Sequence, residues 1–333
     1  MRKSFIIYVG VLFFLLVFGL FSCEQESVSS VSVFDFETQK KLLDSTEWIT
    51  LGAQIFSSKA VSPKKVSCAS CHVPEKAFQD GYEVAILHNK RMIRNTPTLL
   101  NVSRYQTFFW DGRASSVAEQ LEGPLFSRSE MDSSPEYLHG FIQKTPLLKA
   151  AFDEMQLTSP KQATDFVKYA LEKFLVSNCT EETHFDAYMA GETTFSKEEE
   201  QGLKLFMGKA GCVKCHTPPH FTDNQFHDIG LPRRNTIFES YTRDGKDVFR
   251  LGPDFGRGNI VAGQESLFTF RTPSLLNVAQ TAPYMHDGTF RELEEVLDFY
   301  GRTDSILQQN PLNRSEKKDL IAFLHTLNDT RKN

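Results

Sequence analysis

The pattern C-x-x-C-H occurs twice in this chain and constrains its fold more than any other feature. It stands at residues 68–72 as CASCH and at residues 212–216 as CVKCH. In this pattern the two thiols add across the two vinyl groups of a haem, and the histidine that follows reaches the iron. A structural zinc site needs four ligands and each segment offers three, while a thioredoxin-like redox site has no use for the histidine. We therefore expect two haems c, attached through Cys68, Cys71, Cys212 and Cys215 and ligated by His72 and His216.

The duplication extends beyond the cysteines. Residues 96–102 (TPTLLNV) recur at 272–278 as TPSLLNV, and an Asp-Gly pair follows each copy, at 111–112 and at 287–288. Each haem motif is also followed by Phe-x-Asp, at 78–80 and at 221–223. The chain is therefore expected to consist of two related haem units in tandem. The second unit contains roughly thirty extra residues, around 225–265, whose richness in Gly, Asp and Arg predicts a loop.

The start of the chain has the composition of an export signal. Arg2 and Lys3 precede an apolar run over residues 5–21, which is marginal in length for a membrane span. The run ends in Leu20-Phe21-Ser22-Cys23, which resembles a lipoprotein box and predicts lipidation of Cys23; ordinary cleavage nearby is the alternative. We expect a signal peptide at 1–22, a flexible tether at 23–35, and a periplasmic protein that meets the membrane only through a lipid anchor.

The charge balance limits the possible partners. Loss of Arg2 and Lys3 with the signal leaves 35 of the 37 basic side chains against 42 acidic ones. A mildly acidic surface argues against nucleic acid as a partner. It is compatible with docking of a small basic redox protein.

Apolar residues recur with helical spacing along most of the chain. Helices are predicted around 42–56, 162–176, 293–300 and 320–327, and Ser196 with Glu199 forms the sequence of a capping box. Strand-like alternation is scarce. The expected fold is mainly α, with two tandem cytochrome c-like domains that each hold one covalently bound haem. The expected boundaries give an N-terminal haem domain at 36–192 and a C-terminal one at 193–333.

Together these motifs resemble the bacterial di-haem cytochrome c peroxidase family, which includes the MauG-type enzymes. The resemblance covers nearly all of residues 40–330 and includes RNTP at 94–97, FWDGR at 109–113 and APYMHDG at 282–288. It implies that the N-terminal haem reacts with peroxide and that the C-terminal haem passes or stores electrons.

The resemblance implies roles for three residues of the first unit. Glu130 falls on the family's peroxide-site glutamate and Gln120 on its neighbouring glutamine. A carboxylate in a partly dry pocket can carry a proton between the two oxygens of peroxide, although Glu130 read by itself could equally be a solvated loop residue. Trp110 falls on the tryptophan that lies between the haems in the family, a role compatible with that of an ordinary core aromatic.

A calcium site at the domain junction is also implied. Asn95 and the backbone carbonyls of Thr281 and Pro283 match the family's ligands, and oxygen ligands of this kind suit Ca²⁺. The alternative is that Asn95 simply caps the turn before Thr96.

Three departures from the family pattern concern the haem surroundings. His88, the only histidine in its loop, is either a displaceable sixth ligand of the first iron or a plain loop residue. Tyr300 takes the place of the family's methionine ligand to the second iron, as in MauG-like members, although Met285 and a core role for Tyr300 are alternatives. A family arginine in the second TPxL segment is replaced by Leu276, so pairing with a haem propionate is expected from Arg271.

The resulting prediction is a di-haem cytochrome c peroxidase that reduces H₂O₂ with electrons from a small c-type cytochrome or a cupredoxin. One alternative is a MauG-like oxidase that uses H₂O₂ to modify a protein substrate. Another is a di-haem electron-transfer cytochrome without catalytic activity, against which Glu130 and Gln120 argue. The cofactors expected are two haems c and one Ca²⁺.

Overall fold

A computed structural model describes residues 36–180, 182–233, 235–243 and 246–330. The predicted signal peptide, the tether and Cys23 lie outside these residues. Within the described ranges, no helix combines the length and the apolar character needed to cross a membrane.

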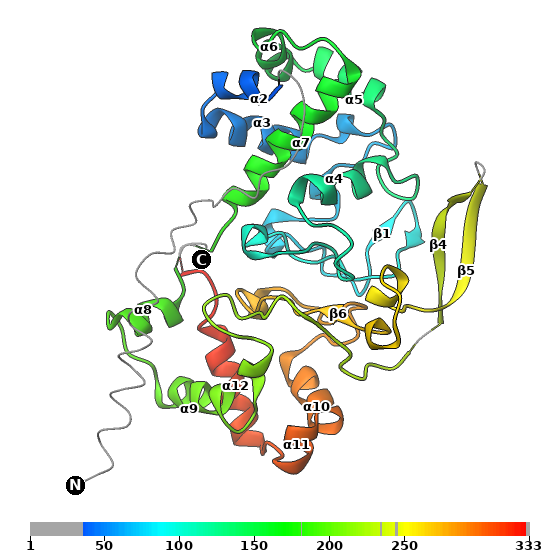
Figure 1. The fold of residues 1–333 in the computed structure, drawn as a ribbon. Coiled ribbons are helices and arrows are strands. Elements are labelled where there is room, and N and C mark those ends of the chain that lie inside the picture. The colour runs from blue at the N-terminus through cyan, green and yellow to red at the C-terminus, as the bar shows by residue number, and fades with distance from the viewer. Residues whose placement is uncertain (1–35, 181, 234, 244–245, 331–333) are drawn as a thin grey trace. The chain divides into compact units, whose positions relative to one another are not determined.

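Helices dominate the described chain, as expected (Figure 1). The α-helices are α2 (Phe36–Gln39), α3 (Ser45–Ser57), α4 (Val117–Phe126), α5 (Pro135–Gln143), α6 (Pro146–Glu154), α7 (Pro160–Ser177), α8 (His184–Ala190), α9 (Lys197–Met207), α10 (Leu293–Thr303), α11 (Ser305–Gln309) and α12 (Arg314–His325). Each C-x-x-C-H motif begins in a short 3₁₀ turn, η3 (Cys68–Ser70) or η6 (Cys212–Lys214). The predicted helices are confirmed, and the Ser196–Glu199 capping box forms at the start of α9.

The same kind of helix crossing occurs once in each half of the chain. Helix α3 crosses α7 at Gly52, where a Cβ atom would collide with the carbonyl oxygen of Ala170 on α7. Helix α9 crosses α12 at Gly202, where a Cβ atom would collide with the carbonyl oxygen of Asp319. A glycine is needed at each crossing because the two backbones approach too closely for any side chain.

Two separate hydrophobic cores form around these crossings. The buried members of the first lie between Phe36 and Leu175, and those of the second lie between Phe185 and Leu327. Phe185, on α8, packs edge-on against Phe221 at 5.2 Å between ring centroids, so it belongs to the second core although it precedes the predicted boundary at 192/193.

Equivalent asparagines of the repeated TPxLLNV segment meet at one residue between the two cores. Asn101 and Asn277 both have left-handed backbones, with φ of 62° and 64°, and both are 1% exposed. The Nδ2 atom of each donates a hydrogen bond of 2.7 Å to Oγ1 of Thr180.

The prediction of a loop for the whole inserted segment was wrong. The described strands form three two-stranded antiparallel sheets, and the longest of these lies within the insert. The pairs are β1 (Ile86–Leu87) with β2 (Lys90–Arg91), β3 (Phe226–His227) with β6 (Phe270–Arg271), and β4 (Asn235–Arg243) with β5 (Lys246–Pro253). The sequence of β4 and β5 is rich in β-branched and aromatic residues, and it places Asp-Gly between the strands, a strong hairpin signal.

Candidate functional site

The first C-x-x-C-H motif presents a histidine prepared to bind a metal. The turn η3 closes when the backbone N–H groups of Cys71 and His72 donate to the carbonyl of Cys68, at 3.2 and 2.8 Å. The ring Nδ1 of His72 lies 3.1 Å from the carbonyl oxygen of Phe78, which can only accept, so Nδ1 carries the hydrogen. Burial lowers the pKa of His72, which favours the neutral ring. Its Nε2 is then the atom with a lone pair for iron.

The second motif repeats this arrangement. The Nδ1 atom of His216 lies 3.0 Å from the carbonyl oxygen of Phe221, and burial lowers the pKa of His216. Phe78 and Phe221 both belong to the Phe-x-Asp repeats and both have left-handed backbones, which turn their carbonyls toward the histidines. Both copies of the repeat therefore contain the histidine and the phenylalanine carbonyl that orients it.

The cysteine thiols of the two motifs are free and have raised pKa values. All four are free in the structure. Burial raises the pKa of Cys68 and of Cys212 to about 12, and that of Cys71 to about 11. Two neutral thiols and one imidazole nitrogen in each unit are a donor set that fits a haem c.

Glu130 lies at the first haem-attachment site. It follows α4 in a turn closed by a 3.0 Å hydrogen bond from its N–H to the carbonyl of Ser127. Its charge contributes, after burial, to the raised pKa of Cys68 and Cys71, and it also acts on Arg113. Gln120 is half-buried on α4. The structure thus brings Glu130 to the cysteines that would hold the N-terminal haem.

Arg113 was missed in the sequence, although it stands in the FWDGR motif. Its guanidinium lies over the ring of Phe109, 3.4 Å from the centroid, and pairs with Asp111 at 2.8 Å. The only signal for it was its presence in a matched motif, because nothing local indicates that Glu130 comes near it.

Trp110 is held by residues from both units. Its ring Nε1 donates to the carbonyl of Asn95 at 3.0 Å, and its own carbonyl accepts from the N–H of Arg271 at 2.9 Å. Arg271 is buried, and its guanidinium lies over the ring of Tyr105, 3.8 Å from the centroid. Leu276 is buried in the second core. The structure therefore gives Arg271 a contact with the tryptophan loop in addition to its predicted role toward a propionate.

Two of the three predicted calcium ligands converge on one side chain. The Nε2 atom of Gln79 lies 3.1 Å from Oδ1 of Asn95 and 3.4 Å from the carbonyl oxygen of Pro283. Asn95 is 3% exposed. Thr281 lies two residues before Pro283, at the end of η9 (Val278–Gln280). In this structure both oxygens accept hydrogen bonds from the Gln79 amide.

Tyr300 lies at the second haem-attachment site. It projects from α10 close enough for Cys212, Cys215 and Asp304 to act on its hydroxyl. Burial raises the pKa of Tyr300, and those neighbours add to the effect. Met285 precedes the Asp-Gly turn with a left-handed backbone, φ 72°.

His88 lies in the turn between β1 and β2. Its side chain is exposed, and its backbone is left-handed with φ of 49°. The tight turn between two-residue strands accounts for this backbone.

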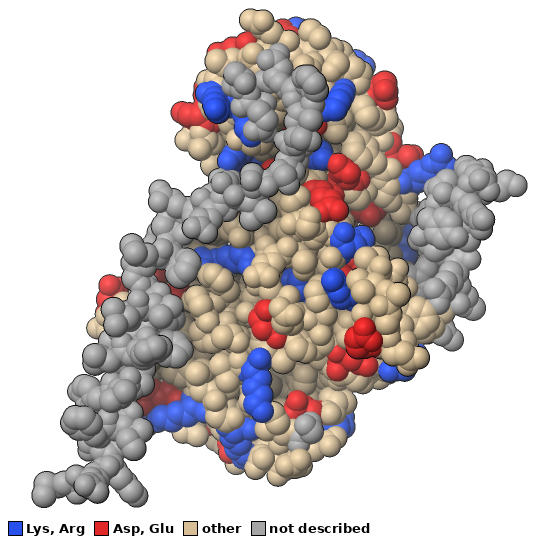
Figure 2. Space-filling view, in the orientation of Figure 1, with Lys and Arg blue, Asp and Glu red and all other residues tan. Residues whose placement is uncertain are grey.

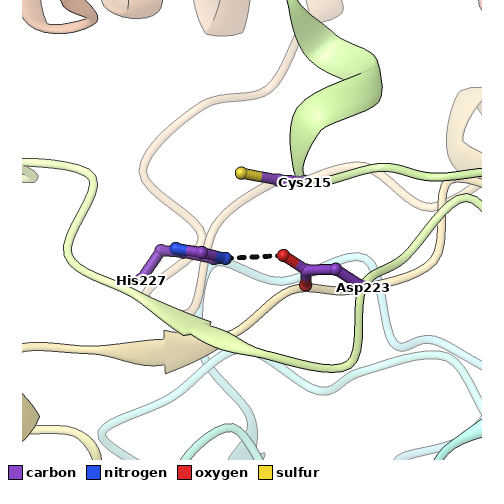
Figure 3. Close-up of side chains that lie close together, drawn as sticks. All are labelled: Cys215, Asp223 and His227. Carbon is purple, nitrogen blue, oxygen red and sulfur yellow. Dashed lines mark hydrogen bonds and ion pairs between the residues drawn. The ribbon is translucent and has the colours of Figure 1, made fainter.

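A side-chain cluster beside the second motif was not predicted. The ligand atoms of Cys215, Asp223 and His227 lie within 4.8 Å of one another, and His227 Nε2 lies 2.7 Å from Asp223 Oδ2 (Figure 3). Attachment of haem to Cys215 converts its thiol to a thioether, which is a poor ligand. The cluster then reduces to an imidazole–carboxylate pair beside the haem. At the matching position of the first unit, four residues after Asp80, stands the buried Val84.

Comparisons with known proteins identify relatives of this chain. A family model described as di-haem cytochrome c peroxidase matches residues 46–194. The methylamine utilization protein MauG of Methylorubrum extorquens is 33% identical over 297 residues, which are 84% of this chain and 78% of that protein. Cytochrome-c peroxidase IdrP2 of a Pseudomonas species is 32% identical over 298 residues, 84% of this chain and 80% of that protein. A solved MauG-like protein associated with microbial copper homeostasis superposes with a TM-score of 0.75 at 27% identity, covering 94% of this chain and 97% of that one.

Proposed function

The chain belongs to the di-haem cytochrome c peroxidase family, and from that premise we propose that it reduces H₂O₂ at its N-terminal haem with Glu130 as the acid–base residue. The single observation that carries this assignment is the position of Glu130, whose charge acts on Cys68, Cys71 and Arg113.

The residues of the first unit divide the work of peroxide cleavage. When bound, the haem iron supplies the binding position for peroxide and electrons for its cleavage. The Phe78 carbonyl fixes the ring of His72, which leaves Nε2 as the atom that would bind the iron. Glu130 accepts the proton of the near peroxide oxygen and delivers it to the far oxygen, which leaves as water. Arg113 favours the carboxylate form of Glu130, which accepts the first proton, and Gln120 orients the peroxide. Two protons and two electrons in all convert one H₂O₂ to two waters.

The substitution Glu130→Gln tests this assignment. We expect peroxide turnover to fall by about 100- to 10,000-fold, the usual contribution of a positioned acid–base group. Both haems should stay attached, as the pyridine haemochrome spectrum would show. The matched control is Glu154→Gln, an exposed position at the end of α6. Wild-type turnover in Glu130→Gln would remove Glu130 from the mechanism.

The electrons for this reaction are proposed to come from a small c-type cytochrome or a cupredoxin in the periplasm. They enter at the C-terminal haem and reach the first unit through Trp110, whose contacts join the two units. On the face in Figure 2, acidic and basic side chains are interspersed, so a donor would meet charges of both signs there. The proposed lipid anchor at Cys23 lies outside the described residues.

A MauG-like oxidation of a partner protein is the second candidate function. Tyr300 favours it, because a phenolate ligand stabilises oxidised iron, whereas a thioether favours the reduced state. A simple electron-transfer cytochrome would need neither Glu130 nor Arg113. Steady-state oxidation of a reduced small cytochrome by H₂O₂ separates the two enzymatic roles, since a MauG-like oxidase would support it poorly.

Calcium is proposed to bind at Asn95 with the carbonyls of Thr281 and Pro283. Asn95 Oδ1 and the Pro283 carbonyl lie close together, since both accept from Gln79 Nε2, and the ion would take the place of that donor. Because Asn95 also accepts the hydrogen bond of Trp110, removal of the ion with a chelator should slow electron transfer between the haems. Readdition of Ca²⁺ should restore the rate. A transfer rate that is indifferent to the chelator would count against the site.

A further inference from the structure

We infer that Asp254, in the segment inserted into the second unit, is a positioning residue that fixes Trp110 between the two units by way of Arg94. The inference rests on the proposed function, in which Trp110 carries electrons between the haems. It concerns three side chains, Arg94, Asp111 and Asp254, here called the interunit ion cluster.

Arg94 binds a carboxylate from each unit. Its Nε and its second terminal nitrogen donate to the two oxygens of Asp254, at 2.7 and 2.9 Å, in a bidentate pair between residues 160 apart in the sequence. Its remaining terminal nitrogen donates to Asp111 at 2.7 Å. The side chains of Arg94, Asp111 and Asp254 are 14%, 5% and 9% exposed, so solvent screens these pairs only weakly. Bidentate pairs of this kind fix orientation as well as distance.

Two residues of the interunit ion cluster are sequence neighbours of Trp110 and of its hydrogen-bond acceptor, Asn95. Asp111 is the next residue after Trp110, and Arg94 directly precedes Asn95, whose carbonyl accepts the tryptophan N–H at 3.0 Å. A single guanidinium therefore ties together the two segments that meet at the indole. Asp254 adds the second unit, whose Arg257 also reaches the carbonyl of Asp111 at 3.3 Å.

Asp254 is itself held firmly. Its Oδ1 accepts from the N–H of Gly256 at 2.9 Å and from Nδ2 of Asn259 at 3.2 Å. These contacts come from the loop and 3₁₀ turn η7 (Arg257–Asn259) that follow β5. The hairpin segment thus presents a pre-oriented carboxylate to Arg94, which gives the insert a role in the path between the haems.

The second copy of the repeat lacks this cluster. There the position of Arg94 is taken by Phe270, and the position of Arg113 by Thr289. Asp287, which matches Asp111, accepts from the N–H and hydroxyl of Thr289 at 3.1 and 2.6 Å. The arginine–carboxylate pairs therefore occur in the copy of the repeat that contains Trp110.

The test compares Asp254→Asn, the conservative Asp254→Glu and the control Glu316→Gln in the haem-loaded protein. Asp254 lines a cavity of about 380 Å³, which leaves room for the extra methylene of glutamate. Glu316 binds Lys209 at 2.7 Å in an exposed pair inside the second unit, away from Trp110.

Two measurements are made on each protein. Hydrogen–deuterium exchange of the segment 105–115 reports how firmly the tryptophan loop is held. Stopped-flow absorbance after one equivalent of H₂O₂, added to the reduced protein, separates the reaction of the first haem from the later oxidation of the second. Electrochemical titration of both haems shows whether the driving force has changed.

In Asp254→Asn we expect faster exchange over 105–115 and about tenfold or more slowing of the second haem's oxidation, as a small misplacement of a transfer group allows. The first reaction and both potentials should stay as in the wild type. Asp254→Glu should recover most of the rate, and Glu316→Gln should match the wild type.

Unchanged exchange and an unchanged second phase in Asp254→Asn would overturn the inference. If Asp254→Asn does not fold, Arg94→Lys gives the same test, because it keeps the charge and loses the bidentate geometry. A wild-type protein whose haems do not respond to H₂O₂ would defeat the proposed function instead, and the exchange result would still decide the role of Asp254.

Discussion

At the scale of single residues, the two units differ most in what faces the haem-attachment cysteines. The first unit has Glu130, with Arg113 nearby, and the second has Tyr300 on α10. The histidines of the two motifs are oriented alike, so the proposed assignment of peroxide chemistry to the first site rests on this difference.

The substitution Tyr300→Met should raise the reduction potential of the second haem. A thioether stabilises the reduced iron, whereas the phenolate stabilises the oxidised iron. Spectroelectrochemical titration measures the shift, and a far-red sulfur-to-iron band should appear in the oxidised variant. The control is Tyr284→Phe, which removes a hydroxyl that donates to the Val278 carbonyl at 3.1 Å. A far-red band already present in the wild type would mean that a methionine, such as Met285, is the native ligand.

The residues that could be predicted at this scale are those with a local signature. Spacing alone indicates the cysteines and histidines, and the roles of Glu130 and Tyr300 remain predictions that rest on resemblance over a long stretch of sequence. The contact of Asp254 with Arg94 could not be predicted, because the two residues are 160 positions apart in the sequence. The contact of His227 with Asp223 could not be predicted either, since nothing in the sequence indicates that their side chains meet.

At the scale of elements, each core is organised by one close helix crossing. Gly52 on α3 and Gly202 on α9 permit the contact with α7 and α12. The helices themselves were predictable, because apolar spacing and capping residues are local properties. The crossings and the β4–β5 hairpin were not, since both depend on partners: a glycine in a helix gives no sign of what faces it, and the Gly, Asp and Arg content of the insert outweighed its strand alternation.

The substitution Gly52→Ala should lower the free energy of unfolding by about 1–3 kcal/mol or more, as overpacking does. The reason is that the new methyl group meets the backbone of α7 at Ala170, which cannot move aside as a side chain could. Gly140→Ala is the matched control: nothing lies within 4 Å of its Cβ position on α5. That variant should instead gain about 0.5–1 kcal/mol from helix propensity. Urea titration measures both, and equal effects would contradict the close crossing.

At the scale of the whole molecule, buried charges between the units make stability depend on pH. Burial would raise the pKa of Asp254, but its hydrogen bonds with Arg94 and the charge of Arg94 outweigh burial and lower the pKa below its ordinary value. The same pair raises the pKa of Arg94 against the effect of burial. The pair therefore stabilises the folded chain only while Asp254 is ionised.

Stability should accordingly fall more steeply in acid for the wild type than for Asp254→Asn. The contribution of Asp254 is complete above its unfolded pKa of about 3.9 and is lost as the pH falls through its lower folded pKa. Urea unfolding of the two proteins between about pH 3 and 6 measures the difference. The exposed control Asp153→Asn should follow the wild-type curve. Parallel curves for the wild type and Asp254→Asn would show that the ion pair adds no stability.

Thr180 bears on how such a chain can change over generations. The repeated segment supplies two asparagines, Asn101 and Asn277. Both donate to the hydroxyl of the same residue, Thr180. Loss of the Thr180 hydroxyl within the intact fold would leave two buried amides without this acceptor, at about 1–3 kcal/mol for each group left unsatisfied. Neither half can then be exchanged by recombination, or expressed alone, without a loss of stability. The shared hydroxyl of Thr180 therefore makes the two halves of the chain depend on each other.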